Sequence, residues 1–334
     1  MLGAANIAIG KVIPAMQQGR LTRVVAIASR SPEKSRAAAQ ALGIPRAYGS
    51  YEALLEDAEV EAIYNPLPNH LHVPWSIRAV EARKHVLCEK PIALTAVQAE
   101  ELRDAAARAG VLVGEAFMVR SHPQWLAVER LIAAGRIGTL QLIHGHFSYS
   151  KRDGNDVRSR VEYGGGVLLD IGCYPITIAR WMFGREPVSA VATIERDPEY
   201  GVDRLTSGVL CFDGGQATFS CGGQLVPYQR VELYGDHGRI EVEVPFTPSP
   251  TSRSRLFVDD GSRLADASAE CIEIDAANQY TLQGDQFSAA IRGVGAVPCP
   301  IDDAIANMRV IDALFRSSET GRFEGIAGET RSLG

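Results

Sequence analysis

Short apolar runs alternate with helix-forming stretches over the first 120 residues, and no other feature of the sequence limits the possible folds as strongly. The apolar runs are residues 24–28, 60–64, 85–88 and 111–113. Between them, an alanine-rich stretch starts at Ser31-Pro32 and stops at Gly43, and a second stretch, 96–109, stops at Gly110. Short strands separated by helices predict βαβ units and a parallel sheet.

The pattern changes after about residue 137. Longer stretches of mixed polarity follow, separated by Gly-Gly and Asp-Gly turns, at residues 139–150, 187–195, 206–221 and 230–244. They predict an open, mostly antiparallel sheet with one face against helices. We expect 247–262 to be a surface loop or hairpin and 301–318 to be a final helix. A length of 334 residues suits two domains, which the change of pattern places at 1–120 and 121–334.

The composition excludes several classes of protein. Lysine and arginine number 34 against 40 acidic residues, and this net charge of −6 disfavours nucleic-acid binding, which needs cations to neutralise phosphates. No run of about 20 apolar residues spans a bilayer, and no secretory signal opens the chain. The 6 cysteines are scattered, which predicts reduced thiols and a cytoplasmic location. The pairs His70/His72 and His144/His146 lack a third ligand, so we expect no metal.

Gly3-Ala4-Ala5-Asn6-Ile7-Ala8 is a degenerate form of the dinucleotide fingerprint G-x-G-x-x-G/A. Gly3 allows the tight turn, and Ala8 allows close packing of helix on strand. Ala5 replaces the middle glycine, but its methyl group still permits backbone approach to a pyrophosphate at a helix N-terminus. We expect Gly3, Ala5, Asn6 and Ile7 to contact a dinucleotide, with a purely structural turn as the alternative. Almost nothing precedes the motif, so we expect a first strand that is truncated or reduced to a stub.

The end of the next strand favours NADP over NAD. It reads Ala28-Ser29-Arg30, with Lys34 one helical turn further on, and no acid stands where NAD-binding folds hold the ribose 2′-hydroxyl. A hydroxyl, a guanidinium and an ammonium suit a 2′-phosphate. A solvated loop arginine is the alternative interpretation.

Two further segments carry groups for proton transfer. Lys90 lies in Glu89-Lys90-Pro91, after the third predicted strand, and the carboxyl ends of parallel strands form the ligand crevice of open α/β sheets. Asp170 and Tyr174 follow the glycine run 164–166 and would share one face of a helix. We interpret the three glycines as room for a flat group to approach the backbone.

Further runs complete the picture: Leu67-Pro68-Asn69-His70-Leu71-His72, Glu115-Ala116-Phe117-Met118 with Arg120 and His122-Pro123-Gln124, Gly284-Asp285-Gln286-Phe287, and Ala306-Asn307-Met308-Arg309. Together with the segments above, they resemble the Gfo/Idh/MocA family of sugar and polyol oxidoreductases, essentially over the whole chain. The resemblance implies an α/β fold with two domains. Residues 1–120 would form a Rossmann dinucleotide-binding domain, and 121–334 an α+β domain with an open, mostly antiparallel sheet that binds substrate and forms the oligomer.

The resemblance also assigns roles to residues. The family's catalytic trio corresponds to Lys90, Asp170 and Tyr174, and Asn155 and Arg158 correspond to substrate contacts. Tyrosine at the last catalytic position is similar to the glucose–fructose oxidoreductase branch, with NADP-dependent xylose dehydrogenase, dihydrodiol dehydrogenase and deoxysugar 3-ketoreductases. The implied cofactor contacts that complete the set are Leu67, Pro68, Asn69, His72, Glu89, Lys90 and Arg120. The sequence departs from the family at Ala5 and at Val119, where relatives often carry tyrosine.

These observations predict an NADP-dependent oxidoreductase that transfers a hydride between a sugar, polyol or cyclic diol and the nicotinamide. Tyr174 would exchange the hydroxyl proton with help from Lys90, and the reverse assignment, with Lys90 as the proton carrier, stays open. One alternative is a non-catalytic NADP-sensing regulatory protein, and another is a sugar 3-ketoreductase of deoxysugar biosynthesis. We expect a homodimer or homotetramer that associates through the C-terminal sheet.

Overall fold

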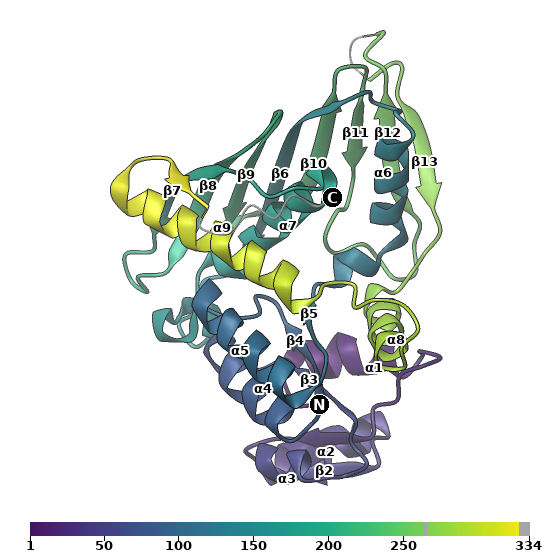
Figure 1. Cartoon of the computed structure of the whole chain (residues 1–334), viewed down its shortest axis with the longest axis vertical. Coiled ribbons are helices and arrows are strands. Elements are labelled where there is room, and N and C mark those ends of the chain that lie inside the picture. Colours follow the sequence, from purple (N-terminus) through teal and green to yellow (C-terminus); the bar gives the residue numbers. More distant parts are fainter. Residues whose placement is uncertain (264–265, 327–334) are drawn as a thin grey trace. The chain divides into compact units, whose positions relative to one another are not determined.

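The computed structural model describes residues 1–263 and 266–326. The chain divides into two compact units (Figure 1). The first unit comprises Met1–His122 and Asn278–Ile305, and the second comprises Pro123–Ala277 and the chain from Ala306 onward. Residues 278–305 therefore group with the first unit, whereas the sequence pattern assigned all of 121–334 to one domain.

Parallel strands form the centre of the first unit. β1 (Ala26–Ala28) pairs with β2 (Arg46–Tyr48), and β3 (Ala62–Asn65), β4 (His85–Glu89) and β5 (Val113–Ala116) pair in that order. These strands are separated by helices along the chain, so the predicted βαβ arrangement and the Rossmann-type fold are confirmed.

The first residues of the chain lie between the two groups of strands. Leu2 forms a parallel bridge with Ala28, and its N–H donates to Tyr64 O at 2.9 Å. Gly3 N–H donates to Ala28 O at 2.8 Å. A groove of about 600 Å³ is lined by Met1 and by residues of 24–26 and 59–64, among others. At the place of the expected first strand, the described residues thus form a bridge and not a ladder.

Glycines end the two helices for which the sequence predicted such an end. α2 (Pro32–Leu42) stops at Gly43 and α5 (Ala96–Ala109) stops at Gly110, with φ of 64° and 68°. These are left-handed backbone angles that favour glycine, and both predicted ends are confirmed. The other α-helices of this part of the unit are α1 (Ile13–Met16), which continues the π-helical turn Ala8–Val12, α3 (Tyr51–Leu55) and α4 (His72–Glu81).

α8 (Gln279–Ile291) explains why residues 278–305 belong to the first unit. The Asp285 carboxylate accepts the N–H groups of residues 20–22 at 2.8, 2.9 and 3.2 Å. Gln286 accepts the Ser121 hydroxyl at 2.6 Å. Asp285 and Gln286 therefore bind segments of the first unit that lie far away in the sequence. No local sequence pattern predicts these contacts.

In the described residues of the second unit, a nine-stranded sheet has the order β13-β12-β11-β10-β6-β9-β8-β7-β14. Every neighbouring pair is antiparallel except β6 and β9, which run parallel. The predicted mostly antiparallel sheet is confirmed. Its strands are β6 (Leu140–Ser150), β7 (Ser189–Arg196), β8 (Asp203–Phe212), β9 (Gly215–Gly222), β10 (Gln224–Gly235), β11 (Arg239–Val242), β12 (Ser254–Asp259), β13 (Glu270–Ile274) and β14 (Glu324–Gly325).

The strand β12 lies inside 247–262, where the sequence predicted a surface loop or hairpin, and its antiparallel pairing with β11 and β13 fits the hairpin and not the loop. Leu256 is fully buried and Val258 is 5% exposed, and the strand pairs with both β11 and β13. The apolar run Leu256-Phe257-Val258 is a short signal, and turn-forming Pro-Ser and Asp-Gly residues flank it on either side.

Helices cover the apolar face of this sheet. A Cβ added at Gly145 of β6 would lie 2.8 Å from Pro175 in α7 (Cys173–Phe183), and one at Gly208 of β8 would lie 3.2 Å from Leu314 in α9 (Ile301–Thr320). α6 (Pro123–Ala133) packs near β12, and its Trp125 donates to Pro245 O at 2.8 Å. Within the described ranges, no helix has the length and apolar character that crossing a membrane requires.

Candidate active site

The turn at Gly3 has the geometry of a backbone cradle. Gly3 has φ of 79°, and a Cβ added there would lie 2.8 Å from Leu67 Cδ2, so only glycine fits without strain. Ala5 and Ile7 pack against the core, and Asn6 is exposed at the start of the helix. The first N–H groups of a helix favour anions. The predicted residues thus share one turn at the start of a helix.

Hydroxyl groups gather where β1 meets α2. Ser29 is 8% exposed, and its Oγ accepts the Ser31 N–H at 3.2 Å. Ser31 caps α2, because its Oγ accepts the Lys34 N–H at 3.3 Å. The Lys34 side chain is exposed one turn into the helix. A helix start with two hydroxyls and an ammonium beside it is a favourable place for a phosphate.

Arg30 stands exposed at the same junction. It interacts with the phenol of Tyr51 and opposes the effect of burial, which raises the pKa of that phenol. The Ser31 hydroxyl donates to Glu33 at 2.9 Å, so one carboxylate also lies at this helix start. The cations Arg30 and Lys34 therefore outnumber the single acid Glu33 at the predicted 2′-phosphate position.

His72 is a buried ring that binds the backbone on both sides. The ring is 1% exposed, with Nδ1 2.7 Å from Pro91 O and Nε2 2.7 Å from Leu67 O. Burial lowers the pKa of His72 to about 4, outweighing the two carbonyls, which favour the imidazolium. Both nitrogens face backbone carbonyls, so His72 holds the segments around Leu67 and Lys90 together, and its predicted contact with a cofactor stays a prediction. Pro68 and Asn69 remain half-buried between these segments.

Lys90 follows β4 in a tightly bonded turn. Glu89 accepts the Tyr64 hydroxyl at 2.5 Å and the Lys90 N–H at 3.3 Å. Glu115 of β5 accepts the N–H of Ile92, just beyond the Glu-Lys-Pro run, at 2.7 Å. The turn is thus held on both sides by carboxylates, and Lys90 itself is half-buried.

Tyr280 of α8 is a member of this site that the sequence did not reveal. Burial raises the pKa of its phenol, the charge of Glu89 adds to this effect, and Lys90 opposes it. The only local sign is that Tyr280 stands one helical turn before the Gly284–Phe287 run. Arg120 lies near the same end of the unit, and its Nε donates to Pro298 O at 3.4 Å.

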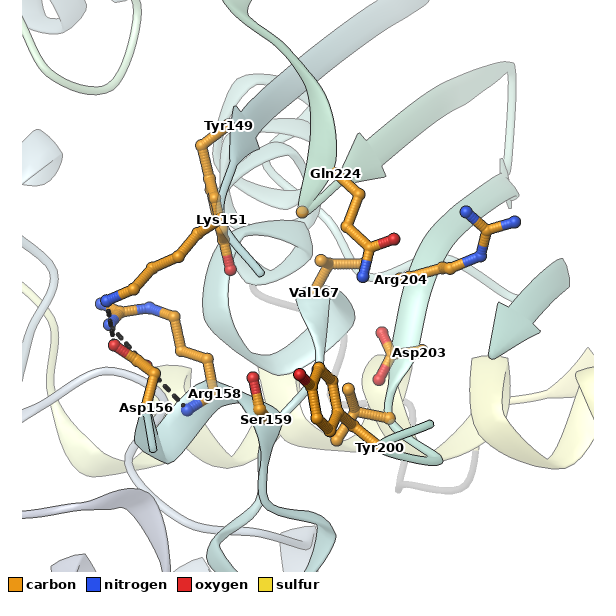
Figure 2. Close-up of a pocket in the computed structure, with 13 residues that line it drawn as sticks. Tyr149, Lys151, Asp156, Arg158, Ser159, Val167, Tyr200, Asp203, Arg204 and Gln224 are labelled. Carbon is orange, nitrogen blue, oxygen red and sulfur yellow. Dashed lines mark hydrogen bonds and ion pairs between the residues drawn. The ribbon is translucent and has the colours of Figure 1, made fainter. Parts of the chain in front are cut away.

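Asp170 is the centre of the corresponding cluster in the second unit. Its Oδ2 accepts the Tyr149 hydroxyl at 3.0 Å and Arg158 Nε at 2.7 Å. Asp170 raises the pKa of Arg158 further above its usual range. Asp156 accepts Arg158 Nη1 at 3.2 Å and also pairs with Lys151 (Figure 2). The carboxylate expected to act on substrate is therefore already bonded to a guanidinium and a phenol.

Tyr174 and Asp170 are joined by a π-helical turn, Leu168–Gly172. Such turns are rare and occur often at functional sites. Tyr174 is 4% exposed, and its ring lies edge-on to Phe147 at 5.6 Å and tilted against Phe246 at 5.2 Å. The aromatic packing fixes the direction of the phenol.

The space beside the glycine run 164–166 is occupied differently from the prediction. A Cβ at Gly165 would lie 2.4 Å from Arg158 O, and one at Gly166 would lie 1.7 Å from Asp203 Oδ1. The space expected for a flat group is thus filled by the protein's own carbonyl and carboxylate. Asn155 is exposed, its N–H donates to Asp153 at 3.0 Å, and it is not among the residues that line the cavity beside Arg158.

Comparisons with known proteins identify the family. The model described as "Oxidoreductase family, NAD-binding Rossmann fold" matches residues 1–117, and the GFO/IDH/MocA C-terminal domain matches residues 125–241. The chain belongs to the Gfo/Idh/MocA oxidoreductase family, and the resemblance seen in the sequence is confirmed.

Individual relatives match over almost the whole chain. An uncharacterised oxidoreductase, ORF334, of Rhizobium meliloti is 45% identical over 98% of each chain. D-xylose 1-dehydrogenase (NADP(+)) 2 of Haloferax volcanii is 35% identical over 96% of this chain and 97% of its own. The crystal structure of KijD10, a 3-ketoreductase from Actinomadura kijaniata in complex with NADP and TDP-benzene, matches with a TM-score of 0.87 and 30% identity, covering 95% and 96% of the two chains.

Proposed function

We propose that the protein is an NADP-dependent oxidoreductase that interconverts a hydroxyl and a carbonyl group on a sugar, a polyol or a cyclic diol. The observation that carries the proposal is the junction of β1 and α2, where Ser29, Arg30 and Lys34 surround a capped helix start. The names of the xylose dehydrogenase and of the ketoreductase complex, which both include NADP, support the same cofactor.

When bound, NADP supplies the nicotinamide carbon that accepts or gives the hydride. In the reductive direction Tyr174 gives its phenol proton to the substrate carbonyl oxygen, and in the oxidative direction its phenolate takes that proton back from the hydroxyl. The Lys90 ammonium stabilises this phenolate and donates to the same oxygen. Asp170 fixes a neighbouring hydroxyl or orients Lys90. The reverse order, with Lys90 as the proton carrier, shares the same pair of groups.

The charges around Asp170 favour an uncharged substrate over a nucleotide-sugar. Between residues 151 and 170, the cations Lys151, Arg152, Arg158 and Arg160 are matched in number by the carboxylates Asp153, Asp156, Glu162 and Asp170. The cations already face carboxylates: Lys151 and Arg158 face Asp156, and Arg152 lies 3.0 Å from Glu199. A diphosphate would have to break such pairs to gain its own.

The test is a spectrophotometric screen of the wild-type protein, with NADP⁺ and NAD⁺ in parallel, over aldoses, inositols and trans-diols. We expect kcat/KM to be at least about tenfold higher with NADP⁺, as one charge-assisted contact to a phosphate provides. Each neutral sugar is paired with its phosphate ester, together with a dTDP-sugar. Preference for NAD⁺ contradicts the cofactor proposal, preference for the dTDP-sugar supports the 3-ketoreductase alternative, and no turnover supports the NADP sensor.

We also propose that the chain acts as a homodimer or homotetramer in the cytoplasm. The outer face of the large sheet carries exposed residues such as His144, Val226 and Tyr228, and an open sheet face of this size is commonly covered by a second subunit. Cys88, Cys173, Cys221 and Cys299 are buried thiols outside any disulfide of the described residues, which suits a reducing compartment. Sedimentation of the wild type against a Tyr228→Glu variant tests the interface, since charge on this face should dissociate the oligomer.

A further inference from the structure

A buried carboxyl group binds the backbone of the segment that carries Asp170. Asp203, the first residue of β8, is 2% exposed. Its Oδ2 accepts the Leu168 N–H at 2.6 Å and the Thr206 hydroxyl at 3.4 Å. Figure 2 shows the Asp203 carboxyl group close to Val167, at the start of the helix. Neither the family motifs nor the proposed proton transfer uses this residue.

The contact with Leu168 satisfies a helix start that would otherwise be unpaired. The helical segment begins at Val167, and the first N–H groups of a helix have no acceptor within the helix. An acid at this place bonds an N–H group and opposes the positive end of the helix dipole. In this chain the acid comes from a distant strand, which ties the helix start to the sheet.

Gly166 and Asp203 fit each other closely. Gly166 has φ of 106°, and a Cβ there would lie 1.7 Å from Asp203 Oδ1. The Gly166 N–H in turn donates to Arg158 O at 2.9 Å, and its carbonyl accepts the Asp170 N–H at 3.2 Å. Asp203 therefore packs against Gly166, whose backbone bonds both to the Arg158 segment and to Asp170.

We propose that Asp203 is a positioning residue, which sets the place of Asp170 and of the Tyr174 helix through the Leu168 N–H and the Gly166 backbone. The inference rests on the proposed function, because it assigns Asp203 a role in that reaction. Asp203 would touch neither substrate nor cofactor. A cavity of about 30 Å³, room for about one water molecule, separates it from Arg158 and Tyr149.

The test compares Asp203→Ala, Asp203→Asn and the control Asp213→Asn, a side chain exposed in the turn after β8. We expect Asp203→Ala to lower kcat about tenfold or more, as misplaced groups do, while KM for NADP⁺ stays within about twofold. Asp203→Asn keeps an oxygen that accepts the Leu168 N–H, so it should recover most of kcat. Asp213→Asn should match the wild type.

Hydrogen exchange of residues 164–174, measured by mass spectrometry, provides a readout that does not need turnover. We expect faster exchange there in Asp203→Ala and not in Asp213→Asn. Wild-type kcat in Asp203→Ala, equal losses in the Ala and Asn variants, or unchanged exchange at 164–174 each overturns the proposal. An inactive wild type whose Asp203→Ala variant still exchanges faster at 164–174 instead contradicts the proposed function and keeps the structural role of Asp203.

Discussion

The turn that carries Lys90 and the turn that carries Asp170 are held in place by the same kind of device. In the first unit, the buried His72 ring lies 2.7 Å from Pro91 O and 2.7 Å from Leu67 O. In the second unit, buried Asp203 accepts the Leu168 N–H at 2.6 Å. In each case a titratable side chain from another element binds main-chain atoms within two residues of a proposed catalytic group.

His72 and Asp203 differ in chemistry because the two backbone segments present different polar groups. The Lys90 segment follows the end of a strand and presents carbonyl oxygens, which need a donor. The Asp170 segment begins a helix and presents N–H groups, which need an acceptor. Burial favours the neutral form in both cases, so the pKa of His72 falls to about 4 and that of Asp203 rises to about 6. The neutral imidazole donates its single N–H to one of the two carbonyls, and Asp203 accepts an N–H. The polarity of the backbone thus favours a donor in one unit and an acceptor in the other.

The largest expected effect tests whether both turns carry the reaction. Lys90→Ala in the first unit and Tyr174→Phe in the second should each lower kcat by about 10²–10⁴, the usual contribution of a proton-transfer group. NADPH binding, followed by its fluorescence, should stay within about twofold of the wild type. Lys11→Ala and Tyr234→Phe are matched controls. Near-normal kcat in either site variant removes that residue from the mechanism and leaves only one of the two turns catalytic.

Glycine substitutions compare how tightly the two units enclose their turns. Gly166→Ala should lower the free energy of unfolding by about 3 kcal/mol or more, because left-handed strain and a collision with Asp203 add together. Gly3→Ala meets a flexible Leu67 side chain and should cost less. Gly43→Ala, with φ of 64° and open space around it, isolates the backbone strain at about 1 kcal/mol. The measurement is urea unfolding. Equal losses at positions 43 and 166 would show that the Asp203 contact adds nothing.

The sequence predicted local features well and tertiary contacts poorly. Gly43 and Gly110 end helices as expected, since a helix stop depends on its own dihedral angles. The interpretation of the 164–166 glycines was wrong, because their partners, Asp203 and the Arg158 carbonyl, come from elsewhere in the chain. The same holds for Tyr280, which lies near Lys90 although 190 positions separate the two in the sequence. Periodicity reports which face is buried and not what it is buried against.

The pH dependence of stability should have opposite signs for the two holding residues. His72 binds a proton more weakly in the folded state, so its contribution is present above about pH 6.5 and is lost as the pH falls towards 4. Asp203 binds its proton more strongly in the folded state, so stability falls as the pH rises from about 3.8 to 6. Each effect amounts to about 3 kcal/mol at most.

Urea unfolding of the wild type, His72→Gln and Asp203→Asn from pH 4 to pH 7 measures the two contributions. As the pH rises, the free energy of unfolding of the wild type should increase relative to that of His72→Gln. Relative to that of Asp203→Asn, it should decrease. A pH profile parallel to that of the wild type in either variant means that the residue keeps its ordinary pKa in the folded protein.

The smallest expected effect concerns Arg30, which has no counterpart in the second unit. Arg30→Ala should raise KM for NADP⁺ about tenfold, the value of one charge-assisted hydrogen bond, and leave KM for NAD⁺ unchanged. Glu33→Gln should act in the opposite direction, because it removes the carboxylate that bonds Ser31 at the same helix start. Initial rates of each variant with NADP⁺ and with NAD⁺ give the four KM values. If Arg30→Ala weakens NADP⁺ and NAD⁺ equally, the guanidinium holds the adenosine ribose or the loop itself, and the selectivity for the 2′-phosphate must come from Ser29 and Lys34 alone.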